Sequence, residues 1–316
     1  MHRFLFTFDI EDFINPNATY ALRTVLEMLK KHKLRAIFFI TGHMAEKLGN
    51  HPEIIELLKN HEIGFHSSSH SVRPTIPEYT DVKSYRKAYS ISLKRETSHI
   101  NPLTGKVEGE GGIYLLQDLF RPKKLEAYRA PGMSWTPPHL EALADLGIKY
   151  DFSSNISTSE PYHYKRITFY PYTFIQHWEG SQHDYQCLLT AILKRKVTIF
   201  DLHPTLYVNQ TIWDSIFYKG NPPTLQKVPE KNPNITQSHF TKFEQLLKQV
   251  NLLQNTKLIE TDPNLITPSK DLTVQENDVQ KYYYTSIKWP KKYFNYNPKF
   301  IRTHFNEFFE AITVKQ

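Results

Sequence analysis

The chain lacks three features that would point to a secreted or membrane protein. It has 316 residues but only one cysteine, Cys187, which excludes an internal disulfide framework and fits a reducing compartment. It has no run of roughly 18 or more apolar residues, the length that a membrane-spanning helix needs. Its N-terminus, MHRFLFTFDIEDF, alternates like a strand and reaches acidic residues by Asp9, unlike a signal peptide. These absences predict a cytoplasmic protein without a transmembrane helix.

The sequence also lacks the patterns that mark nucleic-acid-binding proteins. Its formal net charge is +7, but the lysines and arginines are dispersed along the chain. They form no helix-turn-helix, zinc-finger or RNA-recognition pattern. A basic surface also suits anionic lipid headgroups and phosphate-bearing substrates. We therefore expect no nucleic-acid partner, and the charge by itself identifies no other.

What the sequence does contain is a regular alternation of strand-like and helix-like segments along residues 1–265. Continuous apolar runs are typical of strands buried in a parallel sheet, and apolar residues three or four apart are typical of helices that cover it. The expected strands lie at 3–9, 36–40, 62–65, 125–128, 148–151, 197–200 and 257–259, and the expected helices at about 17–31, 51–60, 136–146, 183–195 and 236–252. These segments make roughly seven β/α units, one fewer than the eight-fold barrel has. The pattern predicts an α/β fold with a parallel sheet or barrel.

Two segments depart from this alternation. Residues 75–125 contain a helix expected from Asp81 to about Thr97 and the polar run NPLTGKVEGEGG, which indicate an insertion over one face of the barrel. Residues 266–316 are crowded with aromatic residues and lysines. We favour a C-terminal extension packed on the barrel by its aromatics, and the alternative is a surface for membrane headgroups or a partner. The predicted organisation is a barrel of residues 1–265 followed by this extension.

The stretch HSSSH at residues 66–70 is the first candidate for chemistry. Two imidazoles four positions apart reach one point if the residues between them form a helical turn. Neutral imidazole suits zinc, iron, cobalt or nickel, and such a site usually adds a carboxylate and keeps one position open for water. Taken alone, however, His66 and His70 are better explained as surface or capping residues in a chain with 15 histidines.

Further polar residues follow the other predicted strands in the same way. Because the carboxyl ends of parallel strands meet on one face of a barrel, we expect these side chains to converge there. The residues at such positions are Asp9, Glu11, Asp12, His66, His70, Arg129, Asp151 and His203. So many convergent strand-end residues predict a functional site.

The stretches that hold these residues resemble the polysaccharide deacetylase family, the NodB-homology carbohydrate esterases, in the branch with peptidoglycan deacetylase-like proteins. The matching stretches are FTFDIED, AIFFITG, HEIGFHSSSH, YRAPG, LADLGIKYDFS and FDLHP, in the order of the family and between residues 1 and 262. The resemblance implies a distorted (β/α)7 TIM-like barrel and the metal-dependent removal of an acyl group from an N-acylated sugar.

The resemblance also implies a metal centre. Asp9 matches the general base of the family, and His66 and His70 match its metal-binding histidines. The cofactor implied is one divalent transition metal ion, with zinc as the first choice. The acidic ligand stays open between Glu11 and Asp12. Strand alternation places Glu11 on the same face as Asp9, whereas a turn that starts at Glu11 would favour Asp12.

The remaining roles follow from the later motifs. Arg129 matches the arginine that orients the base, and the backbone N–H of Gly132 occupies the place of an oxyanion donor. His203 matches the catalytic histidine that acts as general acid, and Asp151 matches the acidic residue that orients it. Leu202, beside His203, would line the acetyl pocket.

The sequence thus predicts a cytoplasmic, metal-dependent enzyme that removes an N-acetyl group from an amino sugar. A nucleotide-linked or lipid-linked sugar is favoured, because its phosphates suit the positive charge. A lipid-linked substrate would bring the protein to the inner membrane face. Trp135 is either a core residue, which we favour, or a platform for a sugar ring. Two alternatives stay open: hydrolysis of another C–N bond, such as a cyclic imide or formamide, and an inactive barrel that binds a glycan or partner.

Overall fold

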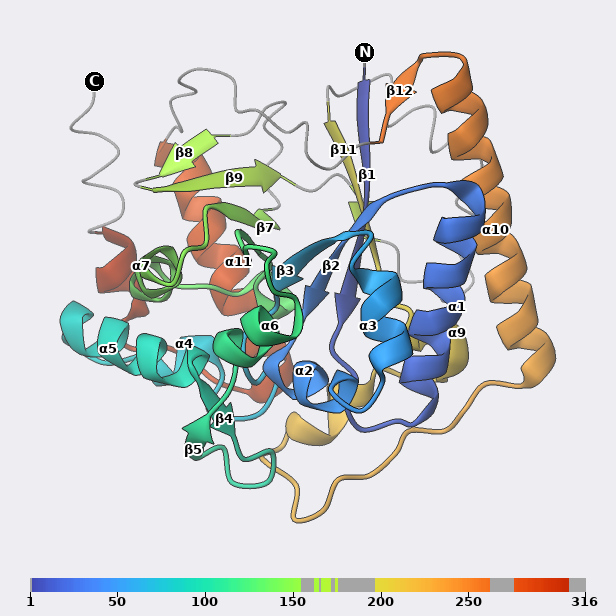
Figure 1. Cartoon of the computed structure of the whole chain (residues 1–316). Helices are drawn as coiled ribbons and strands as arrows, with labels where there is room; N and C mark the ends of the chain where they lie inside the picture. The colour runs from blue at the N-terminus through green and yellow to red at the C-terminus, as the bar shows by residue number, and fades with distance from the viewer. Residues whose placement is uncertain are drawn as a thin grey trace.

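The fold is built around one twisted, mainly parallel sheet (Figure 1). The computed structural model describes residues 2–154, 162–164, 166–171, 174–175, 197–261 and 276–306. The strands of the main sheet are β1 (His2–Ile10), β2 (Ala36–Ile40), β3 (Glu62–Phe65), β6 (Ala127–Tyr128), β7 (Tyr150–Ser154), β8 (Tyr162–Tyr164), β9 (Ile167–Pro171), β10 (Phe174–Ile175), β11 (Val197–Leu202) and β12 (Ile259–Glu260).

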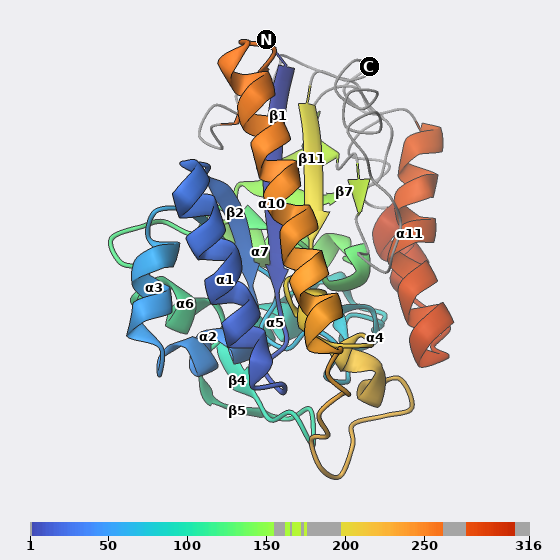
Figure 2. The same cartoon turned by 90° about the vertical axis from the view of Figure 1, so that its right-hand side faces the viewer.

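The strand order confirms the predicted fold class. Neighbouring strands follow the order β10-β11-β1-β2-β3-β6-β7-β9-β8, and β12 pairs with the start of β1. Every pair in this sheet is parallel except β8 with β9. The sheet curls into the distorted barrel of an α/β protein, with helices on its outer face (Figures 1 and 2).

Helices cover the sheet where the sequence pattern places most of them. They are α1 (Asn17–His32), α2 (Gly42–Leu48), α3 (Pro52–Leu58), α7 (Pro137–Asp145) and α10 (Pro233–Asn255). Figure 2 shows α10 lying across β1 and β11, with α1 beside it. The short helix α2 was not predicted. The predicted helix at 183–195 and Cys187 lie outside the described residues.

The side chains of β1 alternate between the two faces of the sheet. Phe6 and Phe8 point outward to the helices, where Phe8 stacks on Phe38 with ring centroids 4.9 Å apart and Phe6 meets Phe243 of α10 edge to face. Leu5 points inward and packs in a separate cluster with Phe39. Because successive strand residues face opposite sides, this parity decides which polar residues can reach the barrel interior.

The segment predicted as an insertion contains three helices and a small antiparallel hairpin. These elements are α4 (Ile76–Tyr79), α5 (Tyr85–Glu96), β4 (Ser98–Ile100), β5 (Val107–Glu110) and α6 (Ile113–Leu119). The predicted helix start at Asp81 is wrong, because the Ser84 side chain caps α5 by accepting a hydrogen bond from the Lys87 N–H. Part of the polar run predicted as a loop is strand β5.

Asp81 instead anchors the C-terminal part of the chain. Its carboxylate accepts hydrogen bonds from the backbone N–H groups of Lys299 and Phe300 and from the hydroxyl of Tyr296. Residues 301–306 begin the helix that follows. A residue of the insertion therefore acts as the N-terminal cap of a helix more than 200 positions away in the chain.

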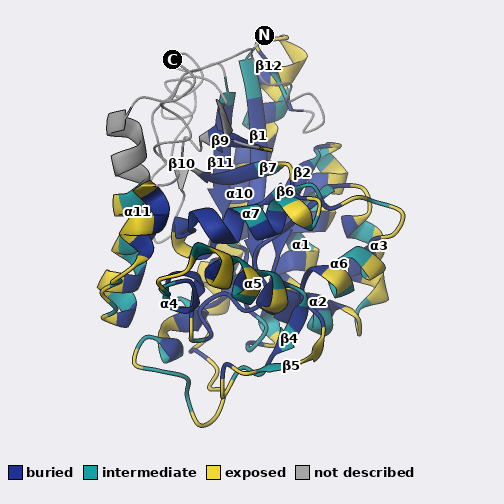
Figure 3. Cartoon of the chain, turned by 90° about the vertical axis from the view of Figure 1, so that its left-hand side faces the viewer, coloured by how far each residue is buried: buried dark blue, intermediate teal, exposed yellow. Residues whose placement is uncertain are grey.

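The described part of the C-terminal region packs against the barrel through aromatic side chains. Helix α11 (Glu276–Phe294) contacts α4 and the 3₁₀ helix η1 (Pro131–Met133), and Phe305 packs against Trp135. Buried and exposed residues alternate along α11 (Figure 3). The predicted boundary at residue 265 lies outside the described residues. Among the helices of the described ranges, none is both long and apolar enough to cross a membrane.

We expect Asp81→Ala to loosen the C-terminal segment without loosening the barrel. The change removes the acceptor of two backbone N–H groups and a hydroxyl, and the loss of a helix cap costs about 1–2 kcal/mol. Hydrogen exchange at residues 299–306 should become faster, while exchange in β1 stays unchanged. Asp118→Ala, which removes an exposed carboxylate of α6, is the control. Equal protection of residues 299–306 in both variants would contradict the anchoring role.

Candidate active site

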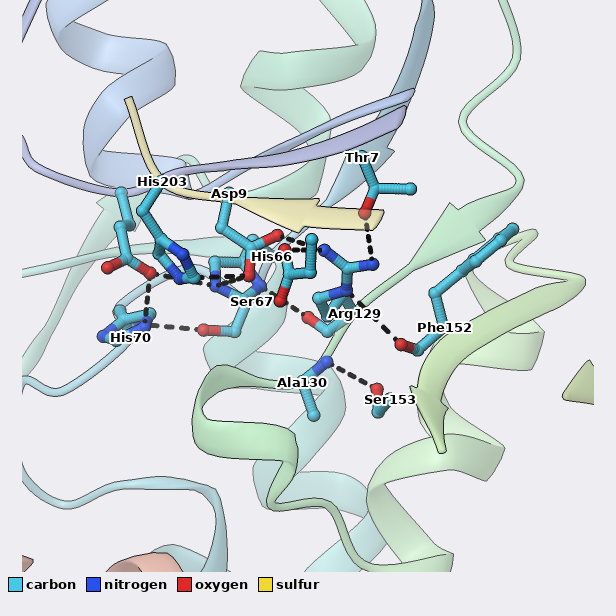
Figure 4. A network of polar contacts seen from close by, with 12 residues as sticks. Thr7, Asp9, His66, Ser67, His70, Arg129, Ala130, Phe152, Ser153 and His203 are labelled. Atoms are coloured by element: carbon cyan, nitrogen blue, oxygen red, sulfur yellow. Dashed lines mark hydrogen bonds and ion pairs between the residues drawn. The ribbon is translucent and has the colours of Figure 1, made fainter. Parts of the chain in front are cut away.

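The two histidines of HSSSH converge through an irregular loop. Ser67 and His70 have left-handed backbone conformations, with φ of 63° and 47°, and the Ser67 hydroxyl accepts a hydrogen bond from the His70 N–H at 3.0 Å. The predicted helical turn between them is therefore wrong. The loop nevertheless brings the imidazoles of His66 and His70 to a centroid distance of 5.1 Å, and both are buried (Figure 4).

A carboxylate lies between these two imidazoles. Glu11 Oε2 is 3.2 Å from His66 Nε2 and 2.8 Å from His70 Nε2, and Glu11 Oε1 accepts a hydrogen bond from Trp213 Nε1 at 2.9 Å. Burial alone would raise the pKa of Glu11, but the His70 and His66 imidazoles outweigh it and hold this pKa well below its usual range. We call Glu11, His66 and His70 the three-donor cluster.

Asp12, the other candidate ligand, is held elsewhere. Its Oδ1 accepts hydrogen bonds from the backbone and side chain of Asn15, and its Oδ2 accepts from Thr205 and Asn209. These bonds tie the loop after β1 to the short helix α9 (Thr205–Val208). Such a bonding pattern is typical of a turn residue. The arrangement favours Glu11 over Asp12 as an inward-facing carboxylate.

The outer hydrogen bonds of the histidines test whether a cation fits here. His66 Nδ1 lies 2.7 Å from the Arg129 carbonyl oxygen, which can only accept, so Nδ1 is the donor. His70 Nδ1 lies 2.7 Å from the Ser71 hydroxyl, which donates to Asp214 and therefore accepts from His70. In neutral imidazoles both Nε2 lone pairs then face Glu11, an arrangement that needs a proton or a metal ion between them. The cluster fits a divalent transition metal.

A second cluster surrounds the fully buried Arg129 (Figure 4). Its guanidinium donates to Asp9 at 2.8 Å, to Asp201 at 2.5 Å and to the Thr7 hydroxyl at 2.8 Å. The other oxygen of Asp9 lies 3.6 Å from His203 Nε2. Within the described residues, two groups of side chains have donor atoms within 4.8 Å of one another and could hold a metal. One is the three-donor cluster, and the other is Asp9 with Asp201 and His203.

The charges in this second cluster oppose the effect of burial on His203. Burial alone would lower the pKa of His203, but the carboxylates of Asp201, Glu11 and Asp9 outweigh it and raise this pKa above its usual value. Burial raises the pKa of Asp201 to about 6, although Arg129 acts in the opposite direction. The result is an imidazole that holds its proton beside carboxylates.

Asp201 was missed in the sequence, where Asp151 was given the role of partner to His203. Strand parity explains the difference. Asp151 pairs in register with the outward-facing Tyr128 and bonds to the backbone and hydroxyl of Ser153, both at 2.9 Å. Asp201 lies two residues before His203, on the inward face of β11. The run FDLHP contained this signal, because residues two apart on a strand share a face.

Strand parity also points the side chain of Leu202 away from the site. Leu202 is fully buried in the hydrophobic cluster between sheet and helices. Trp135 is also fully buried, where it packs against Phe169 and Phe305. The favoured interpretation of Trp135 as a core residue agrees with this packing, and neither side chain lines the cavity described next.

A cavity of about 310 Å³ opens over both clusters. Gly132 lines it with φ of 55°, and a Cβ atom there would lie 2.3 Å from the ring of Trp289 in α11. Glycine is therefore required both by its backbone conformation and by the close approach of α11. The full lining is Asp9, Glu11, His66, His70, Ala130, Gly132, Met133, Asp201, His203, Ile212, Asp214, Tyr218, Lys288, Trp289, Lys292 and Tyr293.

A second residue missed in the sequence is Glu96, which supports the HSSSH loop from α5. Its buried carboxylate accepts hydrogen bonds from the Ser68 N–H at 2.7 Å and the Tyr79 hydroxyl at 2.9 Å, and it lies 3.0 Å from His139 Nε2. The sequence contains no signal for this role, because a glutamate on a helix with few apolar residues is usually a surface residue. The inserted segment thus helps to position the two histidines.

The comparison with protein families agrees with the motifs. A model described as polysaccharide deacetylase matches residues 2–150. Over these residues the chain resembles the polysaccharide deacetylase family, which confirms the predicted resemblance. Among curated proteins, none matches the chain significantly.

Solved structures with a similar fold are distant in sequence. The 4-alpha-glucanotransferase of Thermococcus litoralis is 13% identical, with a TM-score of 0.50 over 85% of this chain and 41% of that one. A family 4 carbohydrate esterase from Streptomyces lividans is 11% identical, with a TM-score of 0.44 over 85% and 98%. A pseudoenzyme of that esterase family from Bacillus anthracis is 14% identical, with a TM-score of 0.40 over 78% and 61%. The chain thus spans about three fifths of the pseudoenzyme, and at these identities the likeness concerns the fold.

The burial of Asp151 leads to a prediction about pH and stability. Burial raises its pKa to about 7 from the ordinary 3.8, so the folded protein holds a proton that the unfolded chain releases. The contribution of the protonated Asp151 to the free energy of unfolding is fully present below pH 3.8 and is lost as the pH rises through 7. Asp151→Asn lacks this pH dependence. Between pH 5 and pH 8 the free energy of unfolding of wild type should therefore fall by about 2–3 kcal/mol relative to that of the variant.

Urea unfolding of both metal-free proteins at the two pH values measures this difference. Asp145→Asn, at an exposed carboxyl of α7, should keep the pH dependence of wild type. A difference between wild type and Asp151→Asn that stays constant with pH would contradict the raised pKa.

Proposed function

We propose that the protein is a metal-dependent hydrolase that removes the N-acetyl group from an amino sugar. The observation that carries this proposal is the three-donor cluster beside Asp9 and His203. Two imidazoles and a carboxylate leave room for water and substrate in the fashion of catalytic zinc sites. The match of residues 2–150 to the polysaccharide deacetylase model supports the same reaction class.

Glu11, His66 and His70 would hold the metal, and zinc is the first choice for this donor set. When bound, such an ion polarises an amide carbonyl and lowers the pKa of water toward about 7. Other residues of the chain hold the metal-binding histidines by hydrogen bonds to the nitrogen that faces away from the metal. The Arg129 carbonyl and the Ser71–Asp214 pair fix which nitrogen of each histidine faces inward.

Asp9 is placed to act as the general base. One of its oxygens is held by Arg129, while the other faces the open side between His66 and His203, at 3.7 and 3.6 Å from their Nε2 atoms. The ion pair with Arg129 fixes the orientation of this carboxylate. Asp9 can therefore take the proton of an attacking water molecule in the cavity.

His203 is placed to act as the general acid. The amide C–N bond breaks when the nitrogen receives a proton, and the products are acetate and the free amine. The raised pKa of His203 keeps that proton available near neutral pH. The backbone N–H of Gly132, at the cavity wall, would stabilise the oxyanion that forms at the carbonyl. The sugar itself, and the cytoplasmic location predicted from the sequence, remain predictions.

The metal site is tested first by elemental analysis. We expect about one equivalent of zinc in the zinc-treated wild type, and none in the His66→Ala/His70→Ala variant. Glu11→Gln should also lose the metal, because it removes a charged ligand. Asp12→Asn, one residue further along, should keep the metal and lose stability. Full zinc content in Glu11→Gln, or loss of zinc in Asp12→Asn alone, would contradict the ligand set.

Release of acetate from a panel of N-acetylated amino sugars then tests the reaction. Wild type with zinc should release acetate, and the double histidine variant should not. Ring opening of a cyclic imide to its half-amide acid, or release of formate from a formamide, instead of acetate release would indicate a different C–N hydrolase. Binding of the sugars without turnover in the zinc-loaded protein would indicate an inactive binding barrel.

The pH dependence of turnover separates Asp201 from Asp151 as the partner of His203. In Asp201→Asn the carboxylate that most raises the pKa of His203 is gone, so this pKa should fall. The alkaline limb of the kcat/KM profile should move to lower pH by about one unit. Asp151→Asn, on the other face of the sheet, should leave that limb in place. Equal shifts in both variants would contradict this assignment.

A further inference from the structure

One wall of the cavity comes from outside the part of the chain that matches the family. The match ends at residue 150, whereas α11 begins at Glu276. This helix contributes Lys288, Trp289, Lys292 and Tyr293 to the cavity lining. Positions four apart lie on one face of a helix, so the two lysines form one row and the two aromatic residues form the next.

The aromatic row seats α11 against the candidate active site. Trp289 packs over Gly132 and lies 6.0 Å from His70 between ring centroids. Tyr293 packs against Tyr218 at 5.0 Å. One turn earlier, the Ser134 hydroxyl donates to the backbone carbonyl of Ser286. The position of the lysine row relative to the cavity is therefore set by the contacts of the neighbouring face of α11.

The lysine row carries charge that the described residues do not neutralise. Within the described ranges, no carboxylate lies within 4.0 Å of Lys288 or Lys292. Lys292 Nζ donates a hydrogen bond to the Tyr293 hydroxyl and lies over the ring of that residue. Both side chains are exposed at the edge of the cavity. The carboxylates at its base already face Arg129 and the histidines. The cavity is thus anionic at its base and cationic along one wall.

We propose that Lys288 and Lys292 bind an anionic group of the substrate, a phosphate or a carboxylate borne by the N-acetylated sugar. Two ammonium groups one helical turn apart suit such a group, which can bridge them. Trp289, which lines the same cavity beside His70, would offer its ring to the sugar. This inference rests on the proposed function, and it narrows the substrate from amino sugars in general to charged ones.

Binding to the metal-free full-length protein tests the inference without turnover. The probes are N-acetylglucosamine, its 1-phosphate and the corresponding N-acetylated uronic acid, titrated by calorimetry. We expect wild type to bind at least one charged sugar about tenfold more tightly than the neutral one. This preference should shrink as the ionic strength rises. Whichever charged probe binds more tightly identifies the anion as phosphate or carboxylate.

Charge variants on α11 provide the matched comparison. Lys288→Gln/Lys292→Gln should lose the preference, whereas Lys291→Gln should keep it, because Lys291 is exposed on the same helix but does not line the cavity. Retention of the preference in the double variant would overturn the inference. An equal loss in Lys291→Gln would also overturn it, because only the overall charge of the helix would then matter.

Two further outcomes separate this inference from the proposed function. Preferred binding of a charged sugar that depends on Lys288 and Lys292, without acetate release from the zinc-loaded protein, supports the lysine site and contradicts the hydrolase. Acetate release from neutral and charged sugars with equal KM supports the hydrolase and overturns the lysine site.

Discussion

The buried guanidinium of Arg129 is the interaction on which the candidate active site depends. One cation at the end of β6 neutralises Asp9 from β1 and Asp201 from β11, which are brought together in the barrel interior. Without that cation, two carboxylates would be buried without compensation, which is strongly destabilising. The same residue fixes the orientation of Asp9, and its backbone carbonyl orients His66. Arg129 is therefore needed both for the stability of the fold and for the geometry of the candidate active site.

Around this ion pair, the site combines rigid and irregular parts. Strands supply Asp9, Arg129 and Asp201, whose directions follow from strand parity. The HSSSH loop takes left-handed backbone conformations and is held from outside by Glu96 of the insertion. Residues placed on strands are positioned by the sheet, whereas the loop needs support from a separate segment. The insertion therefore contributes to the site although it does not line the cavity.

The cavity joins two parts of the chain with different tasks. The barrel, whose first 150 residues match the polysaccharide deacetylase family, supplies the donor atoms, the base and the acid of the proposed reaction. Helix α11 supplies a wall of aromatic and basic side chains. The wall of a pocket determines which substituents of a substrate can be accommodated, so α11 bears on the choice of substrate while the barrel supplies the reacting groups.

The amino-acid sequence by itself determined the alternation of strands and helices and the polar residues at the strand ends, including Asp9, His66, Arg129 and His203. These features depend on local periodicity, which is written into neighbouring residues. Only the tertiary structure decided that Asp201 faces inward while Asp151 faces outward, and that Glu11 meets the histidines while Asp12 closes a turn. It also decided that α11 covers the cavity. Local alternation shows which residues of a strand share a face. Which face turns inward, and which segment covers the site, depend on how segments far apart in the chain pack together.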